Sequence, residues 1–267
     1  MKRFKVGTYD WSNATDTSIN FREKVLLLGQ LVASQVLNAI TAVANKSGIN
    51  NAKLARVDSR KMIIPDSSIA KAALEYAQDM YNVPLLNHCL RTYLWGILLG
   101  QYHNQQPDAE FLYVASLLHD AGLSSKNSSK INKCCFAVTG ASDAKKFVES
   151  RGWEPSKSVA LFNSISMHLN PIVSKTDNTE GFLIKSGAYM DLFGNGHTCI
   201  ATAEKVKIIH QYPRYNFNEE ILHVNHFPDS RAAYFAKFGA EELSRKNPLN
   251  KLESADAHRR LIHTNGD

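Results

Sequence analysis

The chain has 267 residues, of which 44% are hydrophobic, and its formal net charge is +6 at pH 7. A chain of this length and apolar content can bury one large core, and no Pro- or Gly-rich linker divides it, so we expect one compact domain with added segments. The basic residues are scattered and form no long run with aromatic residues, which argues against nucleic-acid binding. The four cysteines lack C-x-x-C spacing, which argues against a disulfide scaffold or a structural zinc ribbon.

Residues 25–43 are the stretch that comes nearest to a membrane-spanning segment. They predict an amphipathic or packing helix instead, because five polar residues interrupt the stretch: Gln30, Ser34, Gln35, Asn38 and Thr41. We favour an ordinary core helix here, and a helix that covers a pocket or forms a dimer interface stays open as an alternative. Lys2-Arg3 precedes no apolar segment, so we expect no secretory signal, no membrane partner and a cytoplasmic location.

Helix signals then recur along the chain, whereas strand signals are scarce. Apolar or small residues follow Ser67-Ser68 at helical spacing, and Pro84 suits the first turn of the next helix because proline lacks an N–H. Further starts or stops are marked by Asp108, Ser142, Gly152, Pro155, Pro171 and Gly194. We therefore predict an all-α fold, with residues 1–64 as an N-terminal helical extension, residues 65–240 as the main domain and residues 241–267 as a polar C-terminal tail.

His88 lies in the helix that starts at Pro84, which is apolar on nearly every face and is therefore expected to be buried. Its helical face includes Thr92 and Trp95, and Arg91 lies one turn along. An interior imidazole needs a partner, which is either a backbone carbonyl or a metal ion with carboxylates. For a single histidine the carbonyl is the more frequent partner.

Three further side chains extend this candidate site. His119-Asp120 ends the predicted helix over residues 108–118, and two adjacent residues that point about 100° apart reach one ion most easily where a helix ends. Asp191 shares a helical face with small and apolar residues, so its carboxylate should meet a cation or several donors unless it turns to solvent. Together His88, His119, Asp120 and Asp191 make a plausible metal site.

His168, Lys126 and Arg91 are the remaining candidates. His168 ends the helix that starts at Pro155, where it is expected to bind substrate, donate a proton or hold a second metal; the alternative is that it caps helix carbonyls. Lys126 follows Asp120 in a serine-rich loop, and it or Arg91 is a candidate to orient an anionic or carbonyl group of a substrate. A solvated lysine is the more common outcome in such a loop.

The order His88, His119-Asp120, Asp191, with each part on its own helix, resembles the HD-domain superfamily of metal-dependent hydrolases over roughly residues 65–230. The resemblance implies a helical bundle in which these four residues hold a divalent metal. Asn87-His88-x-x-Arg91 and His168-Leu169-Asn170-Pro171 look most like the branch that includes cyanamide hydratase. Dinuclear members bring more histidines between the second and last motifs, where this chain has only His168, so we expect one metal ion.

The ligand types suit zinc, iron, manganese or nickel. When bound, such an ion would lower the pKa of a water molecule at the site. We expect Asp120 to accept a proton from that water and His168 to give a proton to the substrate. We expect hydrolysis or hydration of a small polar molecule, in its sharpest form a hydration like that of cyanamide. A phosphohydrolase acting on a nucleotide or phosphomonoester is the alternative, and a non-catalytic metal- or ligand-binding regulator is the second. Two or more cationic side chains converging in the pocket would favour a phosphate substrate, whereas a narrow apolar pocket would favour a small neutral substrate. A homodimer is one possible oligomeric state.

Overall fold

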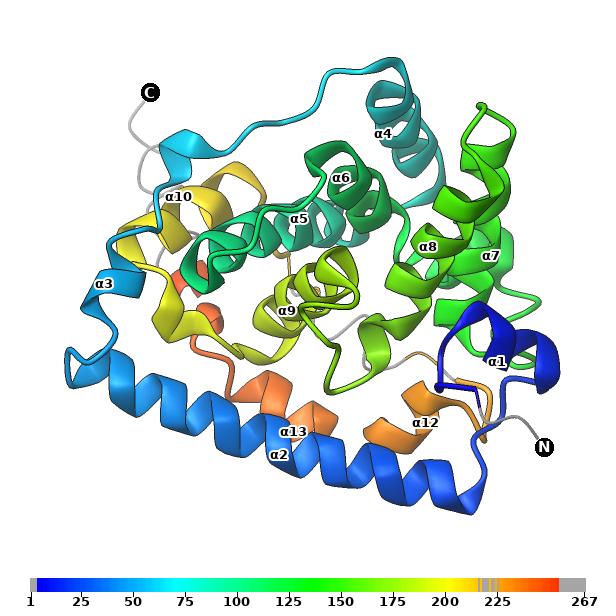
Figure 1. Ribbon diagram of the computed structural model, residues 1–267, viewed down its shortest axis with the longest axis horizontal. Helices are drawn as coiled ribbons and strands as arrows, with labels where there is room; N and C mark the ends of the chain where they lie inside the picture. Colours follow the sequence, from blue (N-terminus) through cyan, green and yellow to red (C-terminus); the bar gives the residue numbers. More distant parts are fainter. Residues whose placement is uncertain (1–3, 216, 218–220, 222–223, 225, 255–267) are drawn as a thin grey trace.

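The computed structural model describes residues 4–215, 217, 221, 224 and 226–254. Every regular element within these residues is a helix, and no strand occurs among them. The prediction of an all-α fold is therefore confirmed (Figure 1).

Two helices form the centre of the molecule, α5 (Val83–His103) and α9 (Thr179–Phe193). Their backbones come so close that a Cβ atom added at Gly187 would lie 2.2 Å from the carbonyl oxygen of Thr92, and one added at Gly96 would lie 3.2 Å from that of Leu183. Glycine is needed at Gly187 because any side chain would push the two helices apart. This close packing brings the C-terminal half of α9 alongside the first half of α5, where His88 lies.

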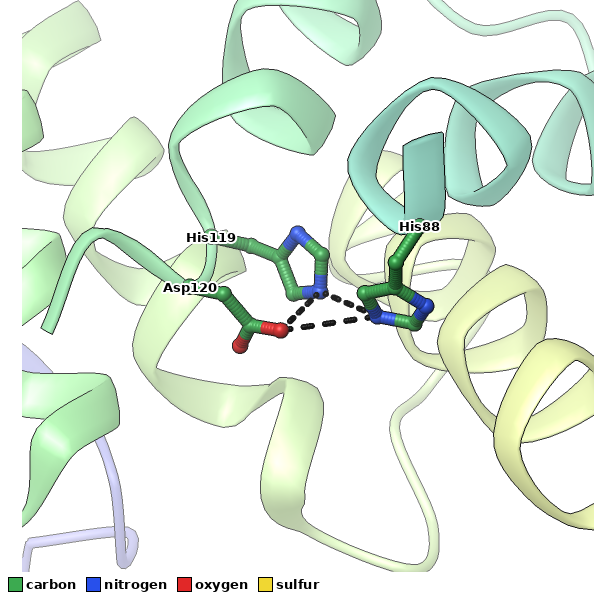
Figure 2. Close-up of side chains that lie close together, drawn as sticks. All are labelled: His88, His119 and Asp120. Carbon is green, nitrogen blue, oxygen red and sulfur yellow. Dashed lines mark hydrogen bonds and ion pairs between the residues drawn. The ribbon is translucent and has the colours of Figure 1, made fainter. Parts of the chain in front are cut away.

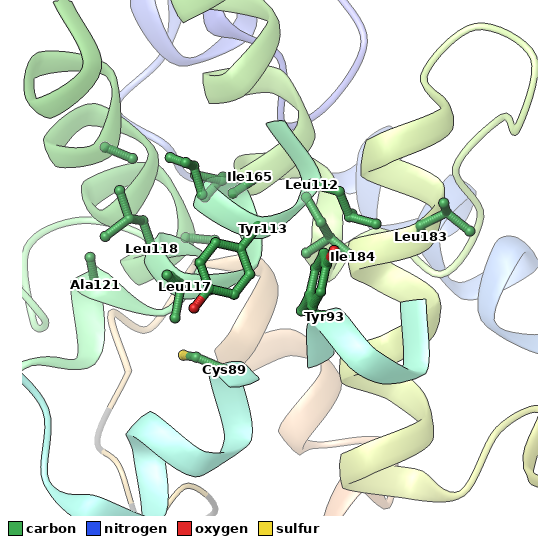
Figure 3. Close-up of a cluster of buried hydrophobic side chains, with 14 of the residues drawn as sticks. Cys89, Tyr93, Leu112, Tyr113, Leu117, Leu118, Ala121, Ile165, Leu183 and Ile184 are labelled. Carbon is green, nitrogen blue, oxygen red and sulfur yellow. The ribbon is translucent and has the colours of Figure 1, made fainter. Parts of the chain in front are cut away.

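Four more helices surround this pair: α4 (Ser68–Met80), α6 (Ala109–Leu118), α7 (Phe136–Glu149) and α8 (Pro155–Ser166). α6 packs against α4, α5, α8 and α9, and α7 packs on α8. The core between them is drawn in Figure 3, where the buried side chains of Cys89, Leu117 and Ile165 come from α5, α6 and α8. α6 is buried along most of its length, which fixes the position of the residues that follow it.

Most of the predicted boundaries agree with the structure, because local chemistry sets them. The Asp108 carboxylate accepts the N–H of Phe111 at 3.0 Å as an N-cap, and Gly194 ends α9 with a φ of +76°. The start of α7 differs: it lies at Phe136, not at Ser142. The Ser142 hydroxyl donates to the carbonyl of Val138 at 2.8 Å, so this serine occupies an interior position of the helix and not its cap.

The periphery is made of shorter elements and one long helix, α2 (Phe21–Lys46). The shorter α-helices are α1 (Tyr9–Ala14), α3 (Asn51–Leu54), α10 (Thr202–Gln211), α12 (Arg231–Ala236) and α13 (Ala240–Arg245). The 3-10 turns are η1 (Ser59–Lys61), η2 (Ala121–Leu123), η3 (Ser125–Asn127), η4 (Met167–Leu169) and η5 (His197–Cys199). In Figure 1, α2 runs along one side of the molecule with α12 and α13 next to it.

The prediction that α2 is an ordinary core helix is wrong. Only 6% of its most apolar stretch is buried, and its length and hydropathy would suffice to cross a membrane. Leu27, Ser34 and Asn45 face the protein, whereas the side of the helix that carries Val32 and Ile40 faces outward. Burial depends on what packs against a helix, which the helix's own sequence does not state.

The segment after α13, predicted as part of a polar C-terminal tail, packs on the protein as far as the structure describes it. Leu249 is fully buried, and the Asn247 amide donates to the carbonyl of Asp191 at 2.8 Å. These residues therefore pack against the end of α9. The division of the chain at residues 64 and 240 stays a prediction.

Candidate metal centre

The side chains of His88, His119 and Asp120 converge in a buried cluster (Figure 2). The Nε2 atoms of the two histidines are 3.2 Å apart, and they lie 3.4 Å and 3.3 Å from Oδ2 of Asp120. His88 projects from α5, while His119 is the C-cap of α6 and Asp120 begins the turn η2. The sequence prediction that a helix end would let both residues of the pair face one point agrees with this arrangement.

The turn after the pair is held in place by the backbone of α7. A Cβ atom at Gly122 would lie 2.0 Å from the carbonyl oxygen of Phe136, and one at Gly140 would lie 2.9 Å from the backbone nitrogen of Gly122. Only glycines allow the turn and α7 to approach this closely. The position of Asp120 therefore depends on α7, an element distant from it in the sequence.

Each histidine at the site is oriented through its Nδ1 atom. His119 donates from Nδ1 to the carbonyl of Ser116 at 2.8 Å, and His88 donates to Oδ2 of Asp191 at 2.8 Å. His168 donates in the same way to the carbonyl of Ile165 at 2.6 Å. Since carbonyl and carboxylate oxygens only accept, the protons are placed on Nδ1, and the Nε2 lone pairs stay free.

Asp191 lies behind His88 and outside the cluster, which differs from the expectation that it binds a metal directly. Its Oδ1 accepts from Nε of Arg91 at 2.8 Å and from the indole of Trp95 at 3.0 Å, and its Oδ2 accepts from Arg91 and His88. Burial raises the pKa of this carboxyl, but Arg91 outweighs burial and holds the pKa well below the usual range. Asp191 is thus an anion that holds His88 in position.

His168 faces the same cluster from the turn η4. Its Nε2 lies 3.7 Å from Oδ1 of Asp120, and its ring meets the ring of His119 edge-on at a centroid distance of 4.9 Å. It both caps a carbonyl of α8 and faces the site, so the two alternatives weighed for it are compatible.

The residues present fit a divalent metal. Three Nε2 lone pairs surround the carboxylate of Asp120, whose Oδ1 is buried and has no hydrogen-bond partner among the described residues. An uncompensated carboxylate is costly to bury, and a cation satisfies it together with the imidazoles. Burial lowers the pKa of His119 and, with His119 next to it, that of His168 to about 3, so both stay in the neutral form that binds metals.

Neither Arg91 nor Lys126 reaches the cluster as a substrate-binding cation, which corrects the expectation for both. Arg91 is fully buried, and besides Asp191 it binds the carbonyls of Tyr212 and Pro213. Lys126 is exposed, and its ammonium lies over the ring of Tyr76 at 5.2 Å. The motif Asn87-His88-x-x-Arg91 thus has a structural explanation, because Asn87 also binds the carbonyl of Pro213.

A cavity of about 120 Å³ adjoins the cluster. His88, His119, Asp120 and His168 line one part of it, and most of the remaining wall is apolar. No lysine or arginine among the described residues lines it. Two aromatic or imidazole side chains near the site were missed at the level of sequence: Phe217 stacks on His88 at a centroid distance of 4.1 Å, and His226 lines the cavity. The sequence analysis singled out neither of them.

No family model matches the chain. Its sequence is similar to two proteins of Saccharomyces cerevisiae, cyanamide hydratase DDI2 and cyanamide hydratase DDI3. The identity is 27% over 153 residues in each case, which covers 56% of this chain and 68% of each relative. This similarity supports a cyanamide-hydratase-like relationship. Together with the buried His–His–Asp cluster, this similarity indicates an enzyme of the hydratase or hydrolase type.

Proposed function

We propose that this protein is a metal-dependent hydratase of the HD superfamily that adds water to a small neutral nitrile-type substrate such as cyanamide. The observation that carries the proposal is the Asp120 carboxylate surrounded by three imidazole Nε2 atoms, at the wall of a cavity that no described lysine or arginine lines. The similarity to proteins named cyanamide hydratase supports the choice of substrate.

His88, His119 and Asp120 would hold the metal, which is zinc, iron, manganese or nickel on the basis of these ligands. When bound, such an ion supplies Lewis acidity and makes water a better nucleophile at neutral pH. Asp191 contributes by orienting His88, so that its Nε2 stays directed at the cluster.

Hydration of a nitrile forms a bond between the water oxygen and the nitrile carbon. One carbon–nitrogen π bond breaks, its electron pair moves to nitrogen, and the nitrogen takes up a proton while water loses one. Oδ1 of Asp120 is placed to accept the proton from water, because no described group occupies it. Nε2 of His168 carries no proton of its own, because the ring proton is on Nδ1. It lies 3.7 Å from that oxygen, so it is placed to take the proton from Asp120 and pass it on to the substrate nitrogen. With cyanamide this step gives isourea, and transfer of its O–H proton to the imino nitrogen gives urea.

A phosphohydrolase needs several donors around the phosphate to offset its charge. The cations that sequence analysis considered for this role are engaged elsewhere or exposed, and the described wall of the cavity is apolar. We therefore place the phosphohydrolase below the hydratase. Only an activity assay distinguishes the hydratase from a regulator that binds metal without turning over a substrate.

The test is urea formation from cyanamide by protein loaded separately with each of the four metals. We expect turnover with at least one metal, and a loss of kcat of ~10²–10⁴-fold in His168→Ala, the range for a general acid or base. The matched control is His210→Ala, an exposed histidine, which should retain full activity. A metal-loaded protein that hydrolyses phosphomonoesters but not cyanamide would replace this proposal with the alternative.

A further inference from the structure

The cavity beside the cluster is much larger than cyanamide. A cavity needs roughly 10–15 Å³ to hold one water molecule, so its volume of about 120 Å³ has room for roughly eight to twelve groups of that size. Cyanamide has three non-hydrogen atoms. A substrate that fills this space therefore carries an additional group.

The wall of the cavity determines the chemistry of that group. Apolar side chains from five helices line it: Leu31 of α2, Phe136 of α7, Leu192 of α9, Phe235 of α12 and Leu243 of α13. Away from the cluster, Gln35 is a rare polar residue among the described lining residues. A surface of this kind gains free energy by excluding water from hydrocarbon, and it offers no compensation to a charge.

We propose that the natural substrate is a nitrile or N-substituted cyanamide that bears an uncharged hydrocarbon group of about the size of a phenyl ring. The nitrile end meets the cluster of His88, His119 and Asp120, and the hydrocarbon group occupies the apolar part of the cavity. This inference rests on the proposed function for its reaction, but not for the binding of the hydrocarbon group.

The experiment compares kcat/KM for N-benzylcyanamide and cyanamide with metal-loaded protein. We expect N-benzylcyanamide to be preferred by at least tenfold, since filling an apolar pocket by even one methylene is worth roughly that factor. Leu243→Trp, which fills the cavity from α13, should lower this preference at least tenfold. The matched control is Arg245→Trp on the exposed side of the same helix, which should retain the preference. Equal kcat/KM values in the wild-type protein, or a preference that Leu243→Trp leaves intact, would overturn the inference.

If neither compound reacts, a binding measurement still tests the apolar subsite independently of the proposed function. Calorimetry of metal-loaded protein with N-benzylurea and with urea, the two expected products, needs no turnover. We expect N-benzylurea to bind at least tenfold more tightly and with a negative heat-capacity change, the mark of apolar burial. Equal or undetectable binding of the two would contradict the apolar subsite, whatever the reaction.

A second observation, independent of the cavity, concerns the outer face of α2. Eight large apolar side chains on this helix are more than half exposed: Phe21, Val25, Leu26, Val32, Val36, Leu37, Ile40 and Val43. No charged residue lies between Lys24 and Lys46. An exposed apolar surface of this extent is rare in monomeric proteins and marks an interaction site.

Polar contacts on the inner side fix the orientation of α2. The Asn38 side chain accepts the N–H of Gly196 at 2.8 Å, and the Asn45 side chain accepts the hydroxyl of Tyr102 at 2.7 Å and donates to Thr198 at 3.1 Å. The helix therefore cannot rotate to bury its apolar face without losing these bonds. The described residues of the chain leave this face uncovered.

The spacing of the outer residues favours a second helix as the cover. Exposed positions recur at alternating intervals of four and three residues, which is the period of helix-to-helix packing: Val25, Gly29, Val32, Val36, Ala39 and Val43. Gly29 has open space around it, so a partner helix can approach closely there. Two helices of 26 residues run together for about 39 Å and bury on the order of 1,000 Å², which is about the minimum expected of a biological interface.

We infer that α2 pairs with α2 of a second copy of this chain. A helix that lies on a membrane carries lysine and arginine along its polar face. The polar face of α2 instead carries uncharged amides that are bonded to the protein. This difference favours the second copy over a lipid surface.

Sedimentation analysis of the full chain tests this pairing. We expect a dimer for the wild-type protein and a monomer for the double variant Val32→Glu, Val36→Glu, with unchanged helical circular dichroism. Ile63→Glu is the matched control, because Ile63 is 70% exposed outside α2 and its replacement should leave the dimer intact. A wild-type monomer would overturn the inference, as would wild-type protein that floats with phosphatidylserine-containing vesicles while the double variant does not.

Discussion

At the scale of residues, the site depends on a chain of contacts behind the metal-binding atoms. Asp191 links His88 to Arg91 and Trp95, and all four side chains are buried. The sequence predicted that Asp191 would be a carboxylate in need of a cation, which agrees with its pairing with Arg91. Which cation it meets depends on the angle between α5 and α9, and sequence patterns do not give that angle.

Asp191→Asn tests this arrangement. We expect metal affinity to fall ~10–100-fold, as for other groups that orient a metal-binding histidine. We also expect the free energy of unfolding of the metal-free protein to fall by ~3–5 kcal/mol, because Arg91 is left as a buried charge without its anion. Metal titration and urea denaturation measure the two effects. Asp58→Asn, which removes the carboxylate partner of the exposed Arg60, should alter neither, and equal effects of the two substitutions would refute the assigned role.

His103 gives a prediction about pH. Burial, with nearby lysines, lowers the pKa of this histidine to about 4. The unfolded chain takes up the proton near pH ~6.5, well before the folded protein does, so the free energy of unfolding falls as the pH drops from ~6.5 toward 4. His103→Gln should flatten this part of the dependence relative to wild type in urea denaturation. If the free energy of unfolding depended on pH in the same way in wild type and variant between pH ~6.5 and 4, the prediction would be contradicted.

At the scale of elements, the sequence predicts a helix boundary correctly where residues within one turn determine that boundary. Asp108, Pro155 and Gly194 mark helix ends by chemistry within one turn, and the structure places ends there. The start of α7 at Phe136 has no side-chain cap, so no local signal marked it. The exposed face of α2 is likewise a property of its surroundings.

The contact between η2 and α7 predicts the effect of one methyl group. Gly122→Ala places a Cβ atom against the carbonyl of Phe136, a backbone group that cannot move aside. We expect a loss of ~1–3 kcal/mol in the free energy of unfolding, the range for overpacked sites, together with weaker metal binding because Asp120 is displaced. In the Val32→Glu, Val36→Glu background, where α2 has no partner helix, Gly29→Ala has open space and should be neutral or stabilising by up to ~1 kcal/mol. Thermal unfolding of both variants measures these changes. If Gly122→Ala left the free energy of unfolding unchanged, the turn would not depend on this contact.

At the scale of the whole molecule, the positive net charge does not identify the substrate. The formal charge of +6 is spread over a surface, whereas no described lysine or arginine lines the cavity. Composition therefore left a phosphohydrolase open, and only the placement of Arg91 and Lys126 in three dimensions argues against it. We expect 10 mM inorganic phosphate to leave cyanamide turnover unchanged in a steady-state assay, and competitive inhibition at that concentration would point to an anion site.

Metal content tests the central claim most directly. Purified protein is loaded with zinc, iron, manganese or nickel, freed of excess metal and analysed by mass spectrometry, with wild type beside His119→Ala, Asp120→Asn and the exposed-site control His210→Ala. The arrangement of His88, His119 and Asp120 predicts about one equivalent of metal in the wild type and the control, and little in the other two variants. A wild-type protein that retains none of the four metals, or a His119→Ala protein that retains as much as wild type, would contradict the metal centre.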